Sequence, residues 1–433
     1  MNTNFTDTIA AVSSGTARAG VAVLRISGSN AKPIVDKLFS KPLKPRIAAY
    51  GELYTTEGVL LDNVLALYFP APHSYTGEDI AEIHTHGSPA VVSAALRAIF
   101  QSGARQARAG EFTKRAFLNG KLDLIQAEAV ADLIDAETEQ AAINAASQLS
   151  GAISEELTAV YDEITDLLAE FYAVIDYPDE EIEEDKLNDI AEVLRRNSGK
   201  LASVLATFER GRIVKNGVSA VLLGKPNVGK SSLLNALVGY DRAIVTSTPG
   251  TTRDTVEEKA ILGGVLLRLL DTAGVRETND AIERFGVERS ERALADTDLV
   301  FAVLDGSNMT TGEDAHILSL AERSGKPVIK LLNKSDLPQI TDIPGALPVS
   351  AKTLEGFDAL AALITELFAA GDVTAKTSLL SNERQYDLVR RAKEALESAT
   401  VITSASAEAL DDAEHALNHL AQALGGKVTD DVT

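Results

Sequence analysis

Apolar and polar positions alternate differently in different parts of the chain. In the first ~120 residues, short apolar runs bounded by turn residues predict strands at 20–26, 63–69 and 80–83. Residues 88–101 carry apolar positions at helical spacing, and Ser88 followed by Pro89 is typical of a helix start. This mixture predicts an α/β domain.

The periodicity then changes to a helical one. From Leu122 to Phe208, apolar residues recur every three or four positions, and the same pattern returns from Asn382 onward. Both stretches predict long helices. The acidic stretch 176–185 interrupts the first of them and is interpreted as a solvated linker or a helix start.

Between the two helical stretches, strands alternate with helices as in a doubly wound sheet. Apolar runs long enough for buried strands lie at 219–223, 265–270, 299–304 and 327–332. Gly263-Gly264 predicts a hairpin turn. The simplest arrangement is an α/β domain inserted into a helical domain. The predicted boundaries are 1–120, 121–212, 213–372 and 373–433.

Composition narrows the class of protein. The 433 residues carry a formal net charge of -22, so phosphate backbones are repelled unless cations cluster locally. If the chain acts on nucleic acid, we expect a basic partner protein to provide much of the binding. The absence of cysteine excludes disulfides and thiolate chemistry in this chain. No apolar run approaches the ~18 residues of a membrane span, and the first residues lack the order of a signal peptide, which predicts a cytoplasmic protein without a membrane partner.

One motif identifies a nucleotide site. Gly224 to Ser231, GKPNVGKS, fits the phosphate loop pattern G-x-x-x-x-G-K-[ST] between a strand and a helix. Glycines allow backbone N–H groups to converge on phosphate oxygens. Lys230 adds a positive charge near the β- and γ-phosphates, and the Ser231 hydroxyl is a candidate Mg²⁺ ligand.

Three further motifs, in this order, predict a GTPase. The first motif, Asp271-Thr272-Ala273-Gly274, comes at the end of a predicted buried strand. Its aspartate carboxylate can contact Mg²⁺, and the N–H group of its glycine can lie at the γ-phosphate. Asn333-Lys334-Ser335-Asp336 follows another strand, where a carboxylate accepts two N–H donors of guanine and rejects adenine. Ser350-Ala351-Lys352 would close over the base.

Two features concern hydrolysis. The loop 246–254 is rich in Thr, Pro and Gly, and a threonine in it can coordinate Mg²⁺ when the γ-phosphate is bound. Many GTPases carry a glutamine after DTAG to orient water, whereas this chain has Val275. Valine cannot do this, so we favour Glu283 as the residue that handles the water.

Beyond these motifs, the chain resembles the tRNA-modification GTPase family MnmE, also called TrmE. The resemblance in the nucleotide domain rests on GKPNVGKS, TSTPGTTRD, DTAG followed by VRETNDAIER, and NKSD. In the first part it rests on RAGVAVLRISG (18–28), PHSYTGED (72–79), HTHGSP (84–89), ARAGEFTKRAFLNGKLDL (107–124) and QAEAVADLI (126–134).

The resemblance implies an N-terminal folate-binding domain that also dimerises, a helical domain, and a G domain inserted into it. It implies GTP hydrolysis activated by potassium and by contact between two G domains. With the flavoprotein partner MnmG, it implies formation of a (carboxymethyl)aminomethyl group at C5 of the wobble uridine of certain tRNAs. The carbon would come from 5-formyl- or 5,10-methylene-tetrahydrofolate.

Individual residues match positions of the family. The resemblance implies that Glu283 is catalytic, that Arg25, Glu82 and Lys121 bind folate, that Asn227, Thr246, Thr248 and Thr251 hold K⁺, and that Ser231 and Thr252 hold Mg²⁺. The full set predicted to bind GTP comprises Asn227, Val228, Gly229, Lys230, Ser231, Ser232, Thr246, Ser247, Thr248, Pro249, Gly250, Thr251, Thr252, Asp271, Thr272, Ala273, Gly274, Asn333, Lys334, Asp336, Ser350, Ala351 and Lys352. A cation between the phosphates could stabilise developing charge as an arginine finger does.

One departure from the family concerns the last residues. The family ends in Cys-Ile-Gly-Lys, whereas this chain stops at Asp431-Val432-Thr433. We expect a truncated tail, GTP hydrolysis that survives, and impaired tRNA modification. The alternatives are a ribosome-assembly GTPase switch without folate chemistry and a folate-dependent one-carbon transferase with a regulatory GTPase attached. Folate binding discriminates against the first of these.

Overall fold

A computed structural model describes residues 7–15, 17–176, 184–240, 257–270, 294, 297–368, 378–401 and 407–426. The chain divides into two compact units. The first comprises residues 1–130 with 424–427, and the second comprises residues 131–423 with 428–433. The four sequence-based boundaries remain predictions.

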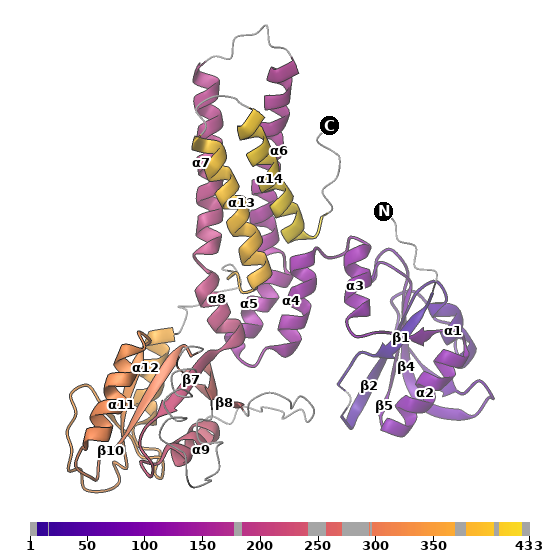
Figure 1. The fold of residues 1–433 in the computed structure, drawn as a ribbon. Helices are drawn as coiled ribbons and strands as arrows, with labels where there is room; N and C mark the ends of the chain where they lie inside the picture. Colours follow the sequence, from indigo (N-terminus) through magenta and orange to yellow (C-terminus); the bar gives the residue numbers. More distant parts are fainter. Residues whose placement is uncertain are drawn as a thin grey trace, which may run out of the picture. The chain divides into compact units, whose positions relative to one another are not determined.

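The first unit is built on a six-stranded sheet in the order β3-β4-β5-β2-β1-β6. Its strands are β1 (Ile9–Val12), β2 (Ala19–Ser27), β3 (Ala49–Tyr54), β4 (Leu60–Phe69), β5 (Ile80–Gly87) and β6 (Arg105–Gln106). Helices α1 (Ala31–Leu38) and α2 (Pro89–Gln101) cover one face (Figure 1), and α3 (Glu111–Leu118) follows β6.

Alternation along each strand decides which residues form the core of this unit. In β4, Val64, Ala66 and Tyr68 are buried while Leu65 between them is exposed. Successive side chains of a strand point to opposite faces, so the alternate residues of β2 and β5 lie on the face away from α1 and α2. Arg25 and Glu82, which are register partners on adjacent strands, are among them.

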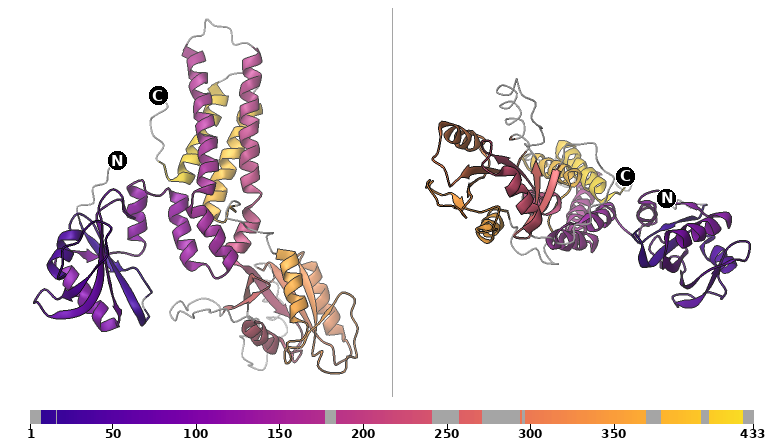
Figure 2. Two further views of the ribbon diagram at one scale, coloured as in Figure 1. Left: turned by 180° about the vertical axis from the view of Figure 1, so that it is seen from behind. Right: turned by 90° about the horizontal axis from the view of Figure 1, so that it is seen from below.

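Most helices of the second unit form an elongated bundle. They are α4 (Leu124–Asp135), which begins in the first unit, α5 (Glu139–Leu149), α6 (Ala152–Asp176), α7 (Glu184–Leu205), α8 (Phe208–Asn216), α13 (Glu383–Val401) and α14 (Ala407–Leu424). Figures 1 and 2 show α13 and α14, from the end of the chain, lying beside α6 and α7. Across the part of the chain that is described, every helix is too short or too polar to span a bilayer.

Hydrogen bonds fix the point where the chain returns to the bundle. The Asn144 side chain accepts from the Leu379 N–H at 2.8 Å and donates to its carbonyl at 3.1 Å, and Gln148 Nε2 donates to the same carbonyl at 2.6 Å. The other crossing point is the end of α8, where β7 begins. The intervening α/β domain is therefore inserted into the helical domain, as the sequence predicts.

That inserted domain has a six-stranded sheet in the order β12-β11-β10-β7-β9-β8, parallel except where β8 pairs with β9. The strands are β7 (Val218–Leu223), β8 (Glu257–Leu262), β9 (Val265–Leu270), β10 (Leu299–Asp305), β11 (Val328–Asn333) and β12 (Leu347–Pro348). The helices are α9 (Lys230–Tyr240), α11 (Gly312–Arg323) and α12 (Phe357–Phe368).

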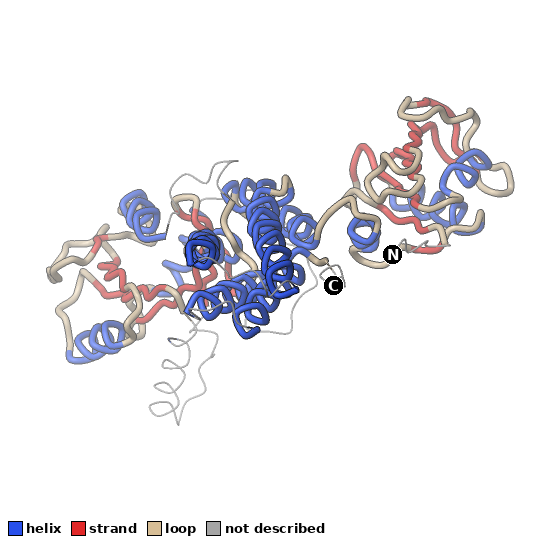
Figure 3. Tube along the Cα trace, turned by 90° about the horizontal axis from the view of Figure 1, so that it is seen from above, coloured by secondary structure: helices blue, strands red, loops and turns tan. Residues whose placement is uncertain are grey.

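Helices lie on both sides of these strands (Figure 3), and each side has its own buried cluster. Leu233 of α9 and Leu360 of α12 pack on one face, whereas Ala321 of α11 packs on the other. A strand covered on both faces is apolar throughout, which explains why every residue of β10 is buried. The doubly wound fold predicted from the sequence is confirmed.

The predicted hairpin turn between β8 and β9 is also present. Gly263 and Gly264 have φ values of 60° and 77°, which are left-handed conformations that favour glycine. A Cβ on Gly263 would lie 2.2 Å from Thr365 Oγ1 of α12. The first glycine is therefore required by close packing as well as by turn geometry.

Candidate functional site

The phosphate loop connects the end of β7 to the start of α9, so the helix N-terminus faces whatever the loop holds. Asn227 and Gly229 adopt left-handed conformations, with φ values of 67° and 94°. Such residues alternate the direction of successive N–H groups and create an anion-binding concavity. Asparagine tolerates this conformation better than most non-glycine residues.

Lys230 lies within this loop. Its Nζ donates to the carbonyl oxygens of Gly224 and Lys225 at 2.6 and 2.9 Å. Burial lowers the pKa of the Lys230 ammonium. A desolvated cation framed by main-chain dipoles attracts a phosphate more strongly than one in bulk water. Ser231 and Ser232 follow in the first turn of α9.

Asn333, the last residue of β11, joins three predicted motifs. Its Nδ2 donates to the Val228 carbonyl at 2.8 Å, and its Oδ1 accepts from the Ala351 N–H at 3.2 Å. The approach is so close that a Cβ on Gly229 would lie 2.4 Å from Asn333 Nδ2. The structure therefore brings the phosphate loop, NKSD and SAK together.

Asp336 lies in the loop after β11 and is exposed. Its Oδ1 accepts a hydrogen bond from the fully buried Ser350 hydroxyl at 2.8 Å. The same hydroxyl oxygen accepts from the N–H groups of Lys352 and Thr353. This hydrogen bond holds Oδ1 in place. The remaining acceptor positions of the Asp336 carboxylate can then accept hydrogen bonds from N–H groups such as those of guanine.

Two buried carboxylates of this domain were missed by the sequence analysis. Asp305 accepts from Lys334 Nζ at 2.6 Å, and Asp314 accepts from Lys225 Nζ at 2.7 Å. A signal for Asp305 existed, because it ends a buried apolar run as Asp271 does. A signal for Asp314 also existed, because Thr311 and Asp314 have the spacing of a helix capping box at the start of α11.

Part of the predicted nucleotide site falls outside the described residues. This applies to the loop from Thr246 to Thr252, to Asp271 through Gly274, to Val275 and to Glu283. Their roles as K⁺, Mg²⁺, γ-phosphate and water-handling residues stay predictions. Of the predicted cation ligands, Asn227 and Ser231 lie in the described loop.

The first unit carries the candidate folate site on the face of its sheet away from α1 and α2. Arg25 Nε donates to Glu82 Oε1 at 2.8 Å, and His84 Nε2 lies 3.5 Å from the other carboxylate oxygen. The Arg25 guanidinium lies over the rings of Tyr75 and Phe112, 5.1 and 5.6 Å from their centroids. Planar cations stack on aromatic rings in this way.

Lys121, the third predicted folate residue, lies in the turn after α3. Its side chain passes close to Gly77, where an added Cβ would lie 3.3 Å from Lys121 Cγ. The structure therefore brings Arg25 and Glu82 into contact and sets Lys121 against the same 72–79 loop that supplies Tyr75. The carboxylate can accept N–H donors of a heteroaromatic ligand, the aromatic rings can stack on it, and the two cations can pair with its acidic groups. These residues therefore fit a folate.

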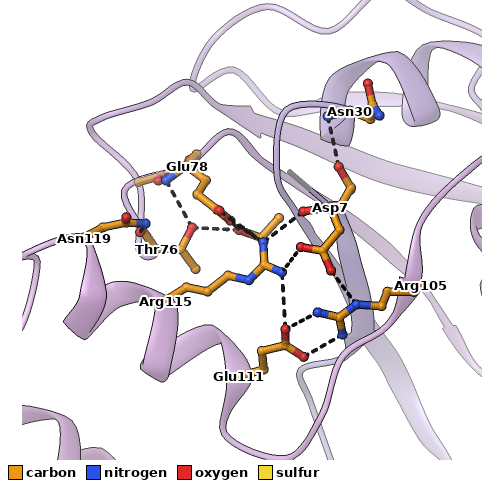
Figure 4. Close-up of polar contacts among 11 residues, drawn as sticks. Asp7, Asn30, Thr76, Glu78, Arg105, Glu111, Arg115 and Asn119 are labelled. Carbon is orange, nitrogen blue, oxygen red and sulfur yellow. Dashed lines mark hydrogen bonds and ion pairs between the residues drawn. The ribbon is translucent and has the colours of Figure 1, made fainter. Parts of the chain in front are cut away.

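A buried ion-pair network anchors the 72–79 loop to α3 (Figure 4). Arg115 is fully buried and contacts Asp7 at 2.8 Å, Glu78 at 3.1 Å and Glu111 at 3.2 Å. The hydrogen bond from Arg105 is the main reason that the pKa of Glu111 is lowered to about 2. Glu78 belongs to the same loop as Tyr75. By holding this loop against α3, the network stabilises the position of Tyr75 in the candidate folate site.

The fold and the tied loops define a P-loop GTPase domain, inserted into a helical domain that follows an α/β domain. Residues 8–121 match the family model described as GTP-binding protein TrmE N-terminus, and residues 124–433 match the MnmE helical domain model. The chain belongs to the MnmE family.

Relatives named tRNA modification GTPase MnmE align along most of the chain. The protein of Laribacter hongkongensis is 44% identical over 423 residues, which is 94% of this chain and 92% of the relative. That of Acetivibrio thermocellus is 40% identical, with 98% and 96% covered. That of Lactococcus lactis subsp. lactis is 42% identical, with 91% and 88% covered.

Proposed function

We propose that this chain hydrolyses GTP and acts in tRNA modification. The proposal rests on the Asn333 side chain, which forms hydrogen bonds with both the phosphate loop and the SAK loop in a chain of the MnmE family. A site held this way presents a triphosphate cradle at one end and the Asp336 carboxylate at the other. The relatives carry the name tRNA modification GTPase.

The finer parts of the proposal come from the resemblance. The chain would act as a cytoplasmic homodimer with the flavoprotein MnmG, and tRNA would be held mainly through that partner. The product would be a (carboxymethyl)aminomethyl group at C5 of the wobble uridine. Arg25, Glu82 and Lys121 would hold the tetrahydrofolate donor, which supplies the one-carbon unit when bound.

In the G domain, each residue has a distinct task. Lys230 would neutralise charge on the β- and γ-phosphates, and Ser231 with Thr252 would hold Mg²⁺. Asn227 with Thr246, Thr248 and Thr251 would hold K⁺ where charge develops. Glu283 would orient the attacking water in place of a glutamine. Binding of 5-formyl-tetrahydrofolate separates this function from a ribosome-assembly switch.

GTP hydrolysis is expected to be at least tenfold faster in potassium than in sodium at matched ionic strength, because a K⁺ of the right size would stabilise the transition state. Asn227→Gly should abolish this difference and still bind GDP, because glycine keeps the left-handed backbone and removes only the side-chain oxygen. Steady-state phosphate release measures the hydrolysis rates in the two salts, and equilibrium titration measures GDP binding. Equal rates in the two salts would refute the potassium site.

Glu283→Ala is expected to slow GTP hydrolysis about a hundredfold, which is the usual scale for loss of a general base. Affinity for GTP should change by no more than a few-fold, since the residue acts on water and not on the nucleotide. Single-turnover hydrolysis and equilibrium titration measure the two effects. Glu288→Ala is the matched control, and collapse of GTP binding in Glu283→Ala would make Glu283 structural.

A further inference from the structure

Lys334 of the NKSD motif makes contacts in two directions. Its Nζ donates to the Asn227 carbonyl of the phosphate loop at 3.1 Å and to Asp305 Oδ2 at 2.6 Å. Lys334 itself has a φ of 69°, so its main chain is held in a left-handed conformation. One ammonium thus connects the base-recognition motif, the phosphate loop and the end of β10.

Asp305 is built to hold that ammonium. Its side chain is 6% exposed, and its Oδ1 accepts from the Ser307 N–H and hydroxyl at 3.0 and 2.6 Å. Oδ2 accepts from Asn308 Nδ2 at 2.9 Å as well as from Lys334. Burial acts to raise the pKa of Asp305, but the hydrogen bonds from Lys334, Ser307 and Asn308 outweigh it and lower the pKa to about 2.

The carboxylate is therefore charged at neutral pH and fixed by three donors that belong to its own turn. A lysine has four flexible side-chain bonds, and holding it in one geometry needs a rigid partner. Lys334 is about one-third exposed, and the contacts described for its Nζ are those with Asp305 and the Asn227 carbonyl. Without Asp305 it would be free to leave the Asn227 carbonyl for water.

We infer that Asp305 is a positioning residue for guanine-nucleotide binding, which acts by holding Lys334 against the phosphate loop at Asn227. The contact of Lys334 with Asn227 then keeps the base-recognition motif and the phosphate loop in a fixed relative position. Loss of this contact accelerates nucleotide release. This inference rests on the proposed GTPase function. Binding of GDP to the unmodified chain is therefore measured first, which separates failure of that function from failure of the inference.

The test is a double-mutant cycle on the full chain, read out by the dissociation rate of a fluorescent N-methylanthraniloyl-GDP. Asp305→Asn, which is nearly isosteric, is expected to speed dissociation about tenfold, or ~1.4 kcal/mol. Lys334→Ala should have an effect of similar or greater size. In the double variant, Asp305→Asn should add less than about twofold to Lys334→Ala, since residues that act through one contact are not additive.

Asp342→Asn is the matched control, because it makes the same chemical change at an exposed aspartate in the connection between β11 and β12. It should change the dissociation rate by less than twofold. Circular dichroism of the nucleotide-free proteins checks that the unfolding temperatures agree. Should Asp305→Asn lower that temperature, Asp305→Glu replaces it, and release within about threefold of the unmodified rate is expected because the charge is kept.

Two results would overturn the inference. One is an additive cycle, in which the two substitutions multiply their effects and Asp305 therefore acts independently of Lys334. The other is an unmodified dissociation rate in Asp305→Asn, or release from Asp305→Glu that is as fast as from Lys334→Ala.

Discussion

Replacing Asp336 by asparagine is expected to lower the affinity for GDP at least about a thousandfold. The carboxylate offers only acceptors, and guanine presents two N–H donors on its Watson–Crick edge. An asparagine amide places a donor against one of these donors, and polar groups left unpaired in this way cost 10⁴ to 10⁵ in the best-studied cases. Xanthine carries an oxygen in place of the amino group, so the variant should prefer xanthosine diphosphate.

Equilibrium titration with both diphosphates measures this exchange of preference. The control is Asp342→Asn, an exposed aspartate in the same connection between β11 and β12, which should leave both affinities unchanged. The Ser350 hydroxyl is expected to keep its bond to the Oδ1 atom of the new side chain, so the loop should retain its shape. Unaltered GDP affinity in Asp336→Asn would show that the base is recognised elsewhere.

The sequence predicts the inserted domain well because its strands are buried on both faces. The apolar run at 265–270, which contains only Arg268 as a polar residue, corresponds to β9 (Val265–Leu270), and the uninterrupted apolar run at 299–304 corresponds to β10 (Leu299–Asp305). Strand β3 (Ala49–Tyr54) was not predicted. It lies at the edge of its sheet, and its exposed Tyr50 and Glu52 interrupt the apolar pattern on which prediction depends.

The candidate site follows the same logic. Motif spacing predicts that phosphate loop, NKSD and SAK meet, since the carboxyl ends of parallel strands share one sheet edge. It cannot predict that Lys334 reaches Asp305 rather than solvent, because that depends on rotamers and on the turn formed by Ser307 and Asn308. Likewise, the sequence does not show that Arg25 pairs with Glu82 on the adjacent strand, or that its guanidinium lies over an aromatic ring.

Arg115→Met is expected to destabilise the first unit by about 3–5 kcal/mol, the usual cost of removing one partner from a buried ion pair. Arg115 is fully buried and pairs with Asp7, Glu78 and Glu111, so its loss leaves carboxylates without their central cation. Hydrogen exchange of peptides from β2 and β5, measured on the full chain, reports the stability of this unit separately. Arg97→Met on the exposed side of α2 is the control and should cost less than ~0.5 kcal/mol.

The pH dependence of this loss distinguishes charge from packing. In the unmodified protein the pKa of Glu111 is lowered from 4.5 to about 2, mainly by Arg105 and further by Arg115, and the pKa of Asp7 is lowered as well. The unfolded state therefore binds more protons between pH 4.5 and 2, so this stabilisation is complete above pH 4.5 and is lost as pH falls toward 2. In Arg115→Met the carboxylates have less stabilisation to lose, so the difference from the unmodified protein should shrink in acid. A penalty that is the same at pH 7 and pH 3 would mean that Arg115 stabilises this unit by filling space and not by its charge.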